Sequence, residues 1–533
     1  MYGSHLLRHS VLALLALLAL AAASTSTASA DTAHASAPSG VGWFQGDVAH
    51  AFQAARAQRK PVFVYFGAVW CPPCQELKAT IFRRKDFLDR LTLFVAVYLD
   101  GDAPEAQRWA DRFHITGYPT VLVLKSDGAE LERIAGGMDL ARYAEVLEAG
   151  LAAVRPIGEL LAAIDHGTTP LSQDECRLLA YNGWQVEDEW IASDDHPGWL
   201  EHTAQQLNSA AQRCPAGARV ERARLQITAA AASAQAEADA LKAGKPPSPA
   251  LAAAVGRVAA ILGQSLLAED VGDTLLWLPK EYFVAAARVD PAGSGALEHT
   301  FDQRLDALAS DPRYSTATQL YAIDQEVVAA KALEPGGKLP AALATEAHQR
   351  LEAVLASVHE PAARSSAVNA ALNTLDDLGD QARSYSVMLE ELKISATPYY
   401  YMADLADLEE KRGHKDAAIE WLARAYHESQ GAATRLQWGS RYVRGLIRLR
   451  PADDRAIRSA ALQVLREVPD GEPIYGRNRS ALDLMASRLH DWNHDGQHAA
   501  TLAAIRASMG QACHRSSHAD TAYAGCNGVL AKL

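Results

Sequence analysis

Residues 61–82 read PVFVYFGAVWCPPCQELKATIF, an apolar run followed by Trp-Cys-Pro-Pro-Cys and a segment with helical character. Two cysteines separated by two residues at the start of a helix form a dithiol that can close reversibly. Because the N-terminal end of a helix favours negative charge, the first sulfur is held partly as thiolate, which is the attacking species in disulfide exchange. The stretch therefore predicts redox chemistry at Cys71 and Cys74.

Other chemistry at this cysteine pair would need residues that the chain does not offer nearby. Haem attachment would need a histidine after Cys74, where the chain has Gln75. A zinc site would need a second pair of cysteines at ligand spacing. The remaining cysteines show no such spacing: Cys176, Cys214, Cys513 and Cys526. We therefore expect no cofactor and no metal at this site beyond the redox-active disulfide itself.

A second signal follows about 45 residues later, where residues 113–120 read FHITGYPT and an apolar strand, 121–124, comes next. With this motif, residues 41–155 resemble the thioredoxin fold. They resemble most closely the periplasmic thioredoxin-like domains related to the C-terminal domain of the DsbD thiol:disulfide interchange protein. The matching pieces are Lys60-Pro61-Val62, Trp-Cys-x-x-Cys, Leu-Lys-x-x-x-Phe and Gly-Tyr-Pro-Thr.

The resemblance implies roles for five residues. Cys71 would be the exposed nucleophile and Cys74 the more buried resolving thiol. Pro119 would follow a cis peptide bond and face the dithiol, and the loop that contains Tyr118 would offer backbone groups to an incoming peptide. Trp70 would shield the pair on one side, although plain core packing would also explain a tryptophan there.

The residues around the dithiol also bear on the direction of electron flow. Pro72 and Pro73 have no N–H group, so the nearest backbone donor to the Cys71 sulfur is the amide of Cys74. A thiolate with few donors is less stabilised, which favours a reducing couple. We therefore expect a reductase, with a membrane electron donor of the DsbD type implied by the resemblance.

The chain departs from the family pattern where a proton acceptor for the second cysteine is usual. Tyr65 stands where many thioredoxins carry a buried aspartate, and Lys78 stands at the position of a second acid. Glu76 is near, and we expect it to be solvated. The group that takes the proton from Cys74 stays open at this point.

The class of protein is limited by the length of the chain, its net charge and the character of its N-terminus. The chain has 533 residues and a formal net charge of −13, and it has no basic, aromatic-interleaved patch, so we expect no nucleic-acid partner. Residues 11–23 form a Leu- and Ala-rich run too short for a typical membrane span, and Ala28-Ser29-Ala30 offers a cleavage site. We expect a signal peptide over 1–30, a flexible leader over 31–40, no membrane span in the mature chain and a periplasmic location; an uncleaved anchor is the alternative.

Export permits structural disulfides. The four cysteines outside the dithiol allow three connectivities, of which we favour nearest-neighbour pairing, Cys176 with Cys214 and Cys513 with Cys526.

Strand-like alternation fades after the first domain, and Ala, Leu, Glu and Arg dominate residues 156–533. Helical patterns separated by Pro and Gly predict a large all-helical domain. Small residues at a 34-residue period around 365–430, such as Gly379 and Gly413, resemble tetratricopeptide-type hairpins; an irregular helical domain is the alternative. Residues 491–496 read DWNHDG and match half of a calcium loop, but Asp, Asn and Gly are also ordinary turn residues.

The sequence as a whole predicts an α/β thioredoxin fold with a central mixed sheet, followed by an all-α domain that binds a protein partner. The expected function is that of an exported thiol:disulfide oxidoreductase acting on protein thiols and disulfides. Two alternatives stay open: an oxidase or isomerase that uses the same residues, and a helical scaffold with a docking thioredoxin domain.

Overall fold

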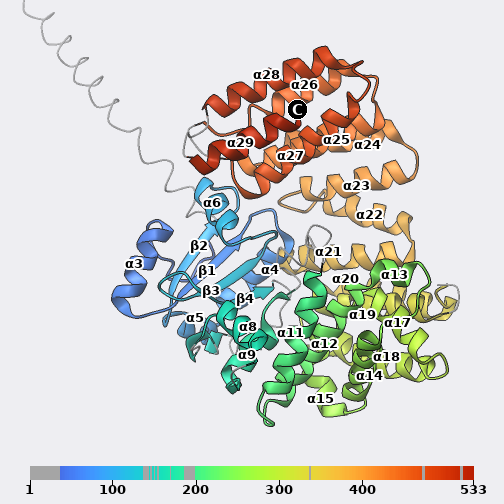
Figure 1. Ribbon diagram of the computed structural model, residues 1–533. Coiled ribbons are helices and arrows are strands. Elements are labelled where there is room, and N and C mark those ends of the chain that lie inside the picture. Colours follow the sequence, from blue (N-terminus) through green and yellow to red (C-terminus); the bar gives the residue numbers. More distant parts are fainter. Residues whose placement is uncertain are drawn as a thin grey trace, which may run out of the picture. The chain divides into compact units, whose positions relative to one another are not determined.

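The computed structural model describes residues 37–135, 143, 147–148, 150–152, 155–167, 170–184, 198–334, 338–470, 474–515 and 520–533 (Figure 1). The expected signal peptide and most of the expected leader lie outside these residues. The same is true of part of the helix that the apolar spacing of Leu140, Tyr143, Leu147 and Leu151 predicts at the end of the first domain. Residues from Ser39 to Leu533 form one compact unit.

The first domain is built on a four-stranded mixed sheet, as the sequence predicts. Its strands lie in the order β2-β1-β3-β4, with β1 central, parallel to β2 and antiparallel to β3, and β4 antiparallel to β3. The strand bounds are β1 Val62–Gly67, β2 Val95–Asp100, β3 Thr120–Leu124 and β4 Glu130–Ala135. Ser126-Asp127-Gly128 predicts a hairpin turn, and the turn between β3 and β4 contains Gly128 at φ +95°, which confirms it.

Strand β1 is buried on both faces, which explains its uninterrupted apolar sequence. Its even-numbered residues pack with α3 (Val48–Gln58) and α6 (Pro104–Arg112) in one core. Its odd-numbered aromatic residues face the other side, where the Tyr65 ring lies 4.8 Å from that of Phe82. The two helical layers hold β1 rigidly, and β1 leads directly to the dithiol.

Two helix boundaries differ from those that the sequence predicts. The apolar spacing of residues 43–58 predicts a helix from Trp43, but α3 begins at Val48, because Asp47 caps it by accepting the N–H of His50 at 2.8 Å. The sequence also predicts a single active-site helix from Cys71 to Phe82, but the helix observed there is shorter. It consists of α4 (Pro72–Ala79), followed by a 3₁₀ turn, η1 (Ile81–Arg83), and a separate helix, α5 (Lys85–Leu91).

The rest of the chain is helical in the part that the structure describes, which confirms the predicted all-α region. The helices between the first domain and residue 334 are α8 Ile157–Asp165, α9 Gln173–Tyr181, α11 Trp199–Arg213, α12 Arg219–Ala236, α13 Ala238–Lys242, α14 Pro249–Leu262, α15 Ser265–Asp270, α16 Gly272–Leu275, α17 Lys280–Val289, α18 Ser294–Ser310 and α19 Thr316–Leu333.

The helices that follow are α20 Ala341–Ser357, α21 Pro361–Leu378, α22 Gln381–Glu391, α23 Tyr399–Lys411, α24 Lys415–Glu428, α25 Ala432–Leu449, α26 Asp454–Val464, α27 Gly476–Trp492, α28 Ala499–Arg515 and α29 Asp520–Lys532. Gly379 and Gly413 end α21 and α23 with φ of +75° and +83°, so each begins a turn into the next helix. This places two successive helix pairs at the predicted 34-residue period; their tetratricopeptide character stays a prediction.

Two disulfides cross-link helices of the helical region, and their pairing is the one expected from the sequence. Cys176 of α9 is bonded to Cys214 at the end of α11, and Cys513 of α28 is bonded to Cys526 of α29. None of the described helices combines the length and apolarity needed to cross a bilayer.

The residues of the half calcium loop form a turn after α27. The side chain of Asn493 accepts the N–H of His498 at 2.9 Å, and that of Asp495 accepts the N–H of Gln497 at 3.1 Å. Both side chains therefore act as turn residues here.

Candidate active site

The dithiol lies at the N-terminus of α4, directly after the loop that follows β1. Cys71 and Cys74 are bonded to each other, with their Cα atoms 5.2 Å apart. Cys71 is the N-cap residue, and its sulfur accepts the backbone N–H of Cys74 at 3.2 Å. Pro72 and Pro73 fill the first two helical positions, where they remove no intrahelical hydrogen bond, so the Cys74 amide is the first donor available to the sulfur.

The loop before β3 forms the opposite wall of the site. The Tyr118–Pro119 peptide bond is cis, as the resemblance implies. The rings of Tyr118 and Trp70 meet edge to face at 6.0 Å, and both pack against a small cluster of Ala68, Cys71 and Cys74. Trp70 and Tyr118 therefore border the two sulfurs, and the roles that the resemblance implies for them stay predictions.

The match to a family model supports a thioredoxin-like fold for the first domain. Residues 48–151 match the family of thioredoxin-like domains. Among solved structures, the chain is similar to the solution structure of a thioredoxin from Thermus thermophilus, with 28% sequence identity over 20% of this chain and 85% of that one, at a TM-score of 0.19. No curated protein matches the chain. The closer relation to DsbD stays a prediction.

The expectation that Cys71 is exposed is wrong in this structure. Its exposed fraction is 2%, and that of Cys74 is 0%. The helical region packs beside this site: the Trp70 ring stacks on Tyr400 of α23 at 6.4 Å, and α21 packs against α4. We call α23, α25 and α27 the cover, since each of them contacts the thioredoxin-like domain beside the dithiol.

The cover also places a cation at the site. The guanidinium of Arg477, in the first turn of α27, lies 5.5 Å from the ring of Trp70 and 5.1 Å from that of Tyr118. Its charge lowers the pKa of Tyr118, but burial dominates and raises that pKa to about 12. Sequence reasoning missed Arg477 and Tyr400 because nothing in their local sequence points to a domain more than 280 residues earlier.

A hydrogen-bonded contact joins the cover to the loop after β2. The Asp102 carboxylate accepts the backbone N–H of Thr434 at 2.8 Å and its hydroxyl at 3.0 Å. Gly431, just before α25, has φ +90°, and a Cβ there would collide with this carboxylate. Burial raises the pKa of Asp102 to about 6, against the lowering effect of the Thr434 hydrogen bonds.

A second polar contact joins α27 of the cover to α6, and these two helices pack against each other (Figure 1). The Asp111 carboxylate accepts the N–H of Gly476 at 3.2 Å and pairs with Arg479 at 3.0 Å. A carboxylate at the N-terminus of α27 also interacts favourably with the helix dipole.

Helix α4 itself packs against α21, and this corrects the expectation for Glu76. Glu76 is half-buried rather than fully solvated. Burial raises the pKa of its carboxyl group, and hydrogen bonds to Ser366 and Ser315 partly offset this rise. Its side chain therefore faces the helical region.

Sequence reasoning missed an acidic residue at the end of the sheet that leads to the dithiol. Asp100 ends β2 beside Gly67 of β1, and its charge raises the pKa values of Tyr65 and Lys78. Burial is the larger effect on both groups; it raises the pKa of Tyr65 and lowers that of Lys78. Asp100 thus supplies an acidic group at this end of the sheet, although the family position for it holds Tyr65.

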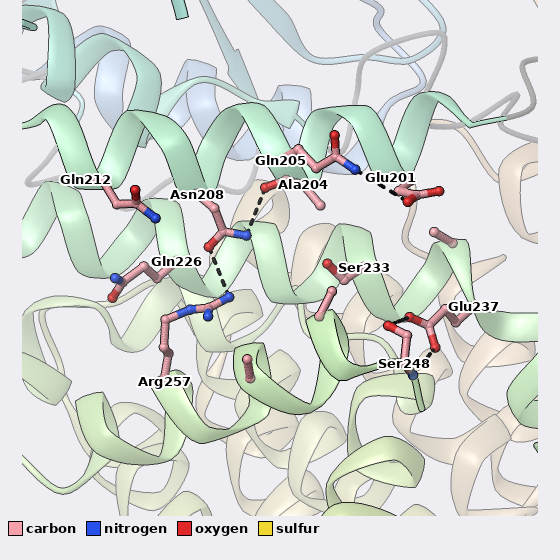
Figure 2. A pocket seen from close by; sticks show the side chains of 13 residues that line it. Glu201, Ala204, Gln205, Asn208, Gln212, Gln226, Ser233, Glu237, Ser248 and Arg257 are labelled. Carbon is pink, nitrogen blue, oxygen red and sulfur yellow. Dashed lines mark hydrogen bonds between the residues drawn. The ribbon is translucent and has the colours of Figure 1, made fainter. Parts of the chain in front are cut away.

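A separate groove lies far along the chain, between α11, α12 and α14, with a volume of about 480 Å³ (Figure 2). Polar side chains line it: Arg257 donates to Asn208 at 3.1 Å, and Glu237 accepts from the Ser248 hydroxyl at 2.5 Å. None of its lining residues belongs to the dithiol site. Among the described residues, no group of three His, Cys, Asp or Glu side chains is arranged to hold a metal ion.

Proposed function

We propose that this protein is an exported thiol:disulfide oxidoreductase that exchanges disulfides through Cys71 and Cys74. The observation that carries the proposal is a cysteine pair at the N-terminus of α4, beside a cis proline, with the first sulfur as the N-cap. A thiolate there is stabilised by the helix end and by the Cys74 amide.

The proposed reaction passes two electrons from the reduced dithiol to a partner disulfide. The Cys71 thiolate attacks one partner sulfur, and the other partner sulfur leaves as thiolate. Cys74 loses its proton, with Asp100 as the candidate acceptor through water or a side chain, and attacks the Cys71 sulfur. The Cys71–Cys74 bond forms, the mixed disulfide breaks, and the partner ends with two thiols.

We further propose the reducing direction, with electrons supplied by a membrane donor of the DsbD type. The support is the donor-poor N-terminus of α4, where two prolines leave the Cys74 amide as the nearest backbone donor to the sulfur. An oxidase or isomerase would use the same residues and would differ in reduction potential. A potential close to that of the strongest periplasmic oxidants would therefore overturn the reducing direction.

The burial of Cys71 adds a condition to this function. A partner disulfide must reach a sulfur that is 2% exposed, so the cover has to move before exchange with a protein. We propose that the helical region binds the partner and that the free energy of this binding offsets the cost of separating the cover from the thioredoxin-like domain.

Trapping tests the function directly. Replacing Cys74 with Ser leaves mixed disulfides on Cys71 unresolved, so partners stay covalently attached and can be identified. Cys71→Ser is the matched control, because it keeps one thiol of the pair but removes the proposed nucleophile. An enzyme captures partners only with the first variant and loses reduction of a model disulfide with both. Absence of trapped partners together with absence of activity in the intact chain would favour the scaffold alternative.

A further inference from the structure

We propose that Arg477 is a positioning residue of the dithiol site, supplied by the helical region, whose charge stabilises the Cys71 thiolate. This inference rests on the proposed function. It makes the site composite: the cysteines come from the thioredoxin-like domain, and the cation comes from a helix about 400 residues later in the chain.

The geometry places the guanidinium over both aromatic walls of the site. Arg477 lies within 6 Å of the ring centres of Trp70 and Tyr118, the range in which a cation is attracted to a ring face. The two rings in turn pack against Cys71 and Cys74. The two rings that Arg477 approaches are thus the same two that border the dithiol.

Arg477 is also a cation without a carboxylate partner among the described residues, although it is half-buried. Its neighbour on the same helix, Arg479, is neutralised by Asp111 at 3.0 Å. An unneutralised charge in a site of low polarity acts strongly on a nearby anion. Burial raises the pKa values of the Tyr118 and Tyr400 phenols, and the charge of Arg477 opposes that rise at both. The carboxylates of Asp102 and Asp100 act on Tyr118 in the opposite direction to Arg477. A thiol would respond to Arg477 with the same sign as the phenols.

This cation adds to the weak stabilisation of the Cys71 thiolate at the N-terminus of α4. With prolines at the first two helical positions, the Cys71 sulfur accepts one backbone N–H, that of Cys74. A positive charge from the cover supplies stabilisation that the backbone lacks. When the cover withdraws, the thiolate loses this stabilisation and becomes a more basic thiol, so the position of the cover and the reactivity of Cys71 are linked.

Arg477 could instead serve only to fasten the cover, and Arg479 provides the control. Both lie in the first turn of α27, and Arg479 makes a fastening contact through Asp111 without lying over the rings. Arg477→Gln removes the charge over the rings, Arg477→Lys keeps a charge there, and Arg479→Gln removes a fastening ion pair. Arg477→Met keeps an apolar stem against the rings and replaces the Gln variant should that one fold poorly.

Two quantities are measured in the full chain. The first is the pKa of Cys71 in a Cys74→Ser background, monitored by the ultraviolet absorbance of the thiolate. The second is the reduction potential of each variant with both cysteines present. We expect Arg477→Gln to raise the Cys71 pKa by about one unit. At a pH above the Cys71 pKa of both variants, it should change the redox equilibrium by about tenfold, or about 30 mV toward reducing. Arg477→Lys should stay close to the wild-type chain, and Arg479→Gln should leave both values unchanged.

Equal shifts for Arg477→Gln and Arg479→Gln, or no shift for either, would overturn the inference and reduce Arg477 to a fastening residue. Failure of the proposed function is a different result: the wild-type chain would then not exchange disulfides at all, whatever the pKa values of the variants.

Discussion

The closed site predicts that a methyl group at residue 431 should expose the dithiol. Gly431 lies just before α25 at φ +90°, and its Cα faces the Asp102 carboxylate so closely that a Cβ would collide with it. Gly431→Ala therefore forces Asp102 away from Thr434, from which the carboxylate accepts two hydrogen bonds. The substitution acts on the contact between the cover and the loop after β2, far from the sulfurs in sequence.

The expected effect follows from the hydrogen bonds that the substitution breaks. A hydrogen bond to a charged group contributes about 1.5–3 kcal/mol. Breaking one of the two Thr434 bonds should thus weaken the closed arrangement by about 2 kcal/mol, which is about 30-fold in the ratio of uncovered to covered protein. If Cys71 reacts only when uncovered, its alkylation should accelerate by about the same factor.

The assay is the rate at which a small alkylating reagent modifies Cys71 in a Cys74→Ser background, where the other four cysteines are held in disulfides. Gly413→Ala is the matched control, because Gly413 has φ +83° and a methyl group added there would have no atom within 4 Å, so it suffers similar backbone strain without touching Asp102. Equal rates for the two variants would refute the idea that the Asp102 contact keeps Cys71 covered.

Two further predictions concern stability. Because burial raises the pKa of Asp102 from 3.8 to about 6, the folded protein binds more protons than the unfolded chain between these pH values. The free energy of unfolding should therefore fall by up to about 3 kcal/mol as the pH rises from about 4 to about 6. Asp102→Asn should flatten this part of a plot of unfolding free energy against pH, and an unchanged slope would assign the pH dependence to other groups. Removing the Cys176–Cys214 disulfide, which has a sequence separation of 38, should lower the free energy of unfolding by about 4 kcal/mol. Removing Cys513–Cys526, with a separation of 13, should lower it by about 3 kcal/mol. Chemical denaturation of the two double-serine variants measures both values, and the reverse order would show that loop length does not govern the effect.

The dithiol and the fold around it could be predicted because their signals are local. Strand β1 is buried on both faces and reads as an uninterrupted apolar run, and prolines after Cys71 fit only the first turn of a helix. The donor to the Cys71 sulfur followed from the absence of N–H groups on two residues. Each of these inferences needed no more than a few consecutive positions.

The cover could not be predicted, because its contacts join segments far apart in the chain. Arg477 and Tyr400 have the sequence context of ordinary helical residues, and Asp102 reads as a solvated loop acid. The same cause explains the two wrong expectations at the site. The resemblance to an isolated thioredoxin-like domain places Cys71 and Glu76 at the surface, whereas here Cys71 is 2% exposed and Glu76 is half-buried on α4, which packs against α21.

Covering a redox-active pair has an energetic consequence for the choice of partner. Opening must break the Asp102 contact, the Asp111 contact and the stack of Trp70 on Tyr400, which lie on different elements of the thioredoxin-like domain. When the competent form of a protein is a small fraction of the whole, the affinity of any ligand for it falls by that fraction. A disulfide-bearing protein that contacts only the dithiol would bind more weakly by the full free energy of opening. One that also binds the helical region would offset that free energy with its additional contacts. The cover should therefore discriminate among partners by how well they bind the helices, and not by the reactivity of their disulfides.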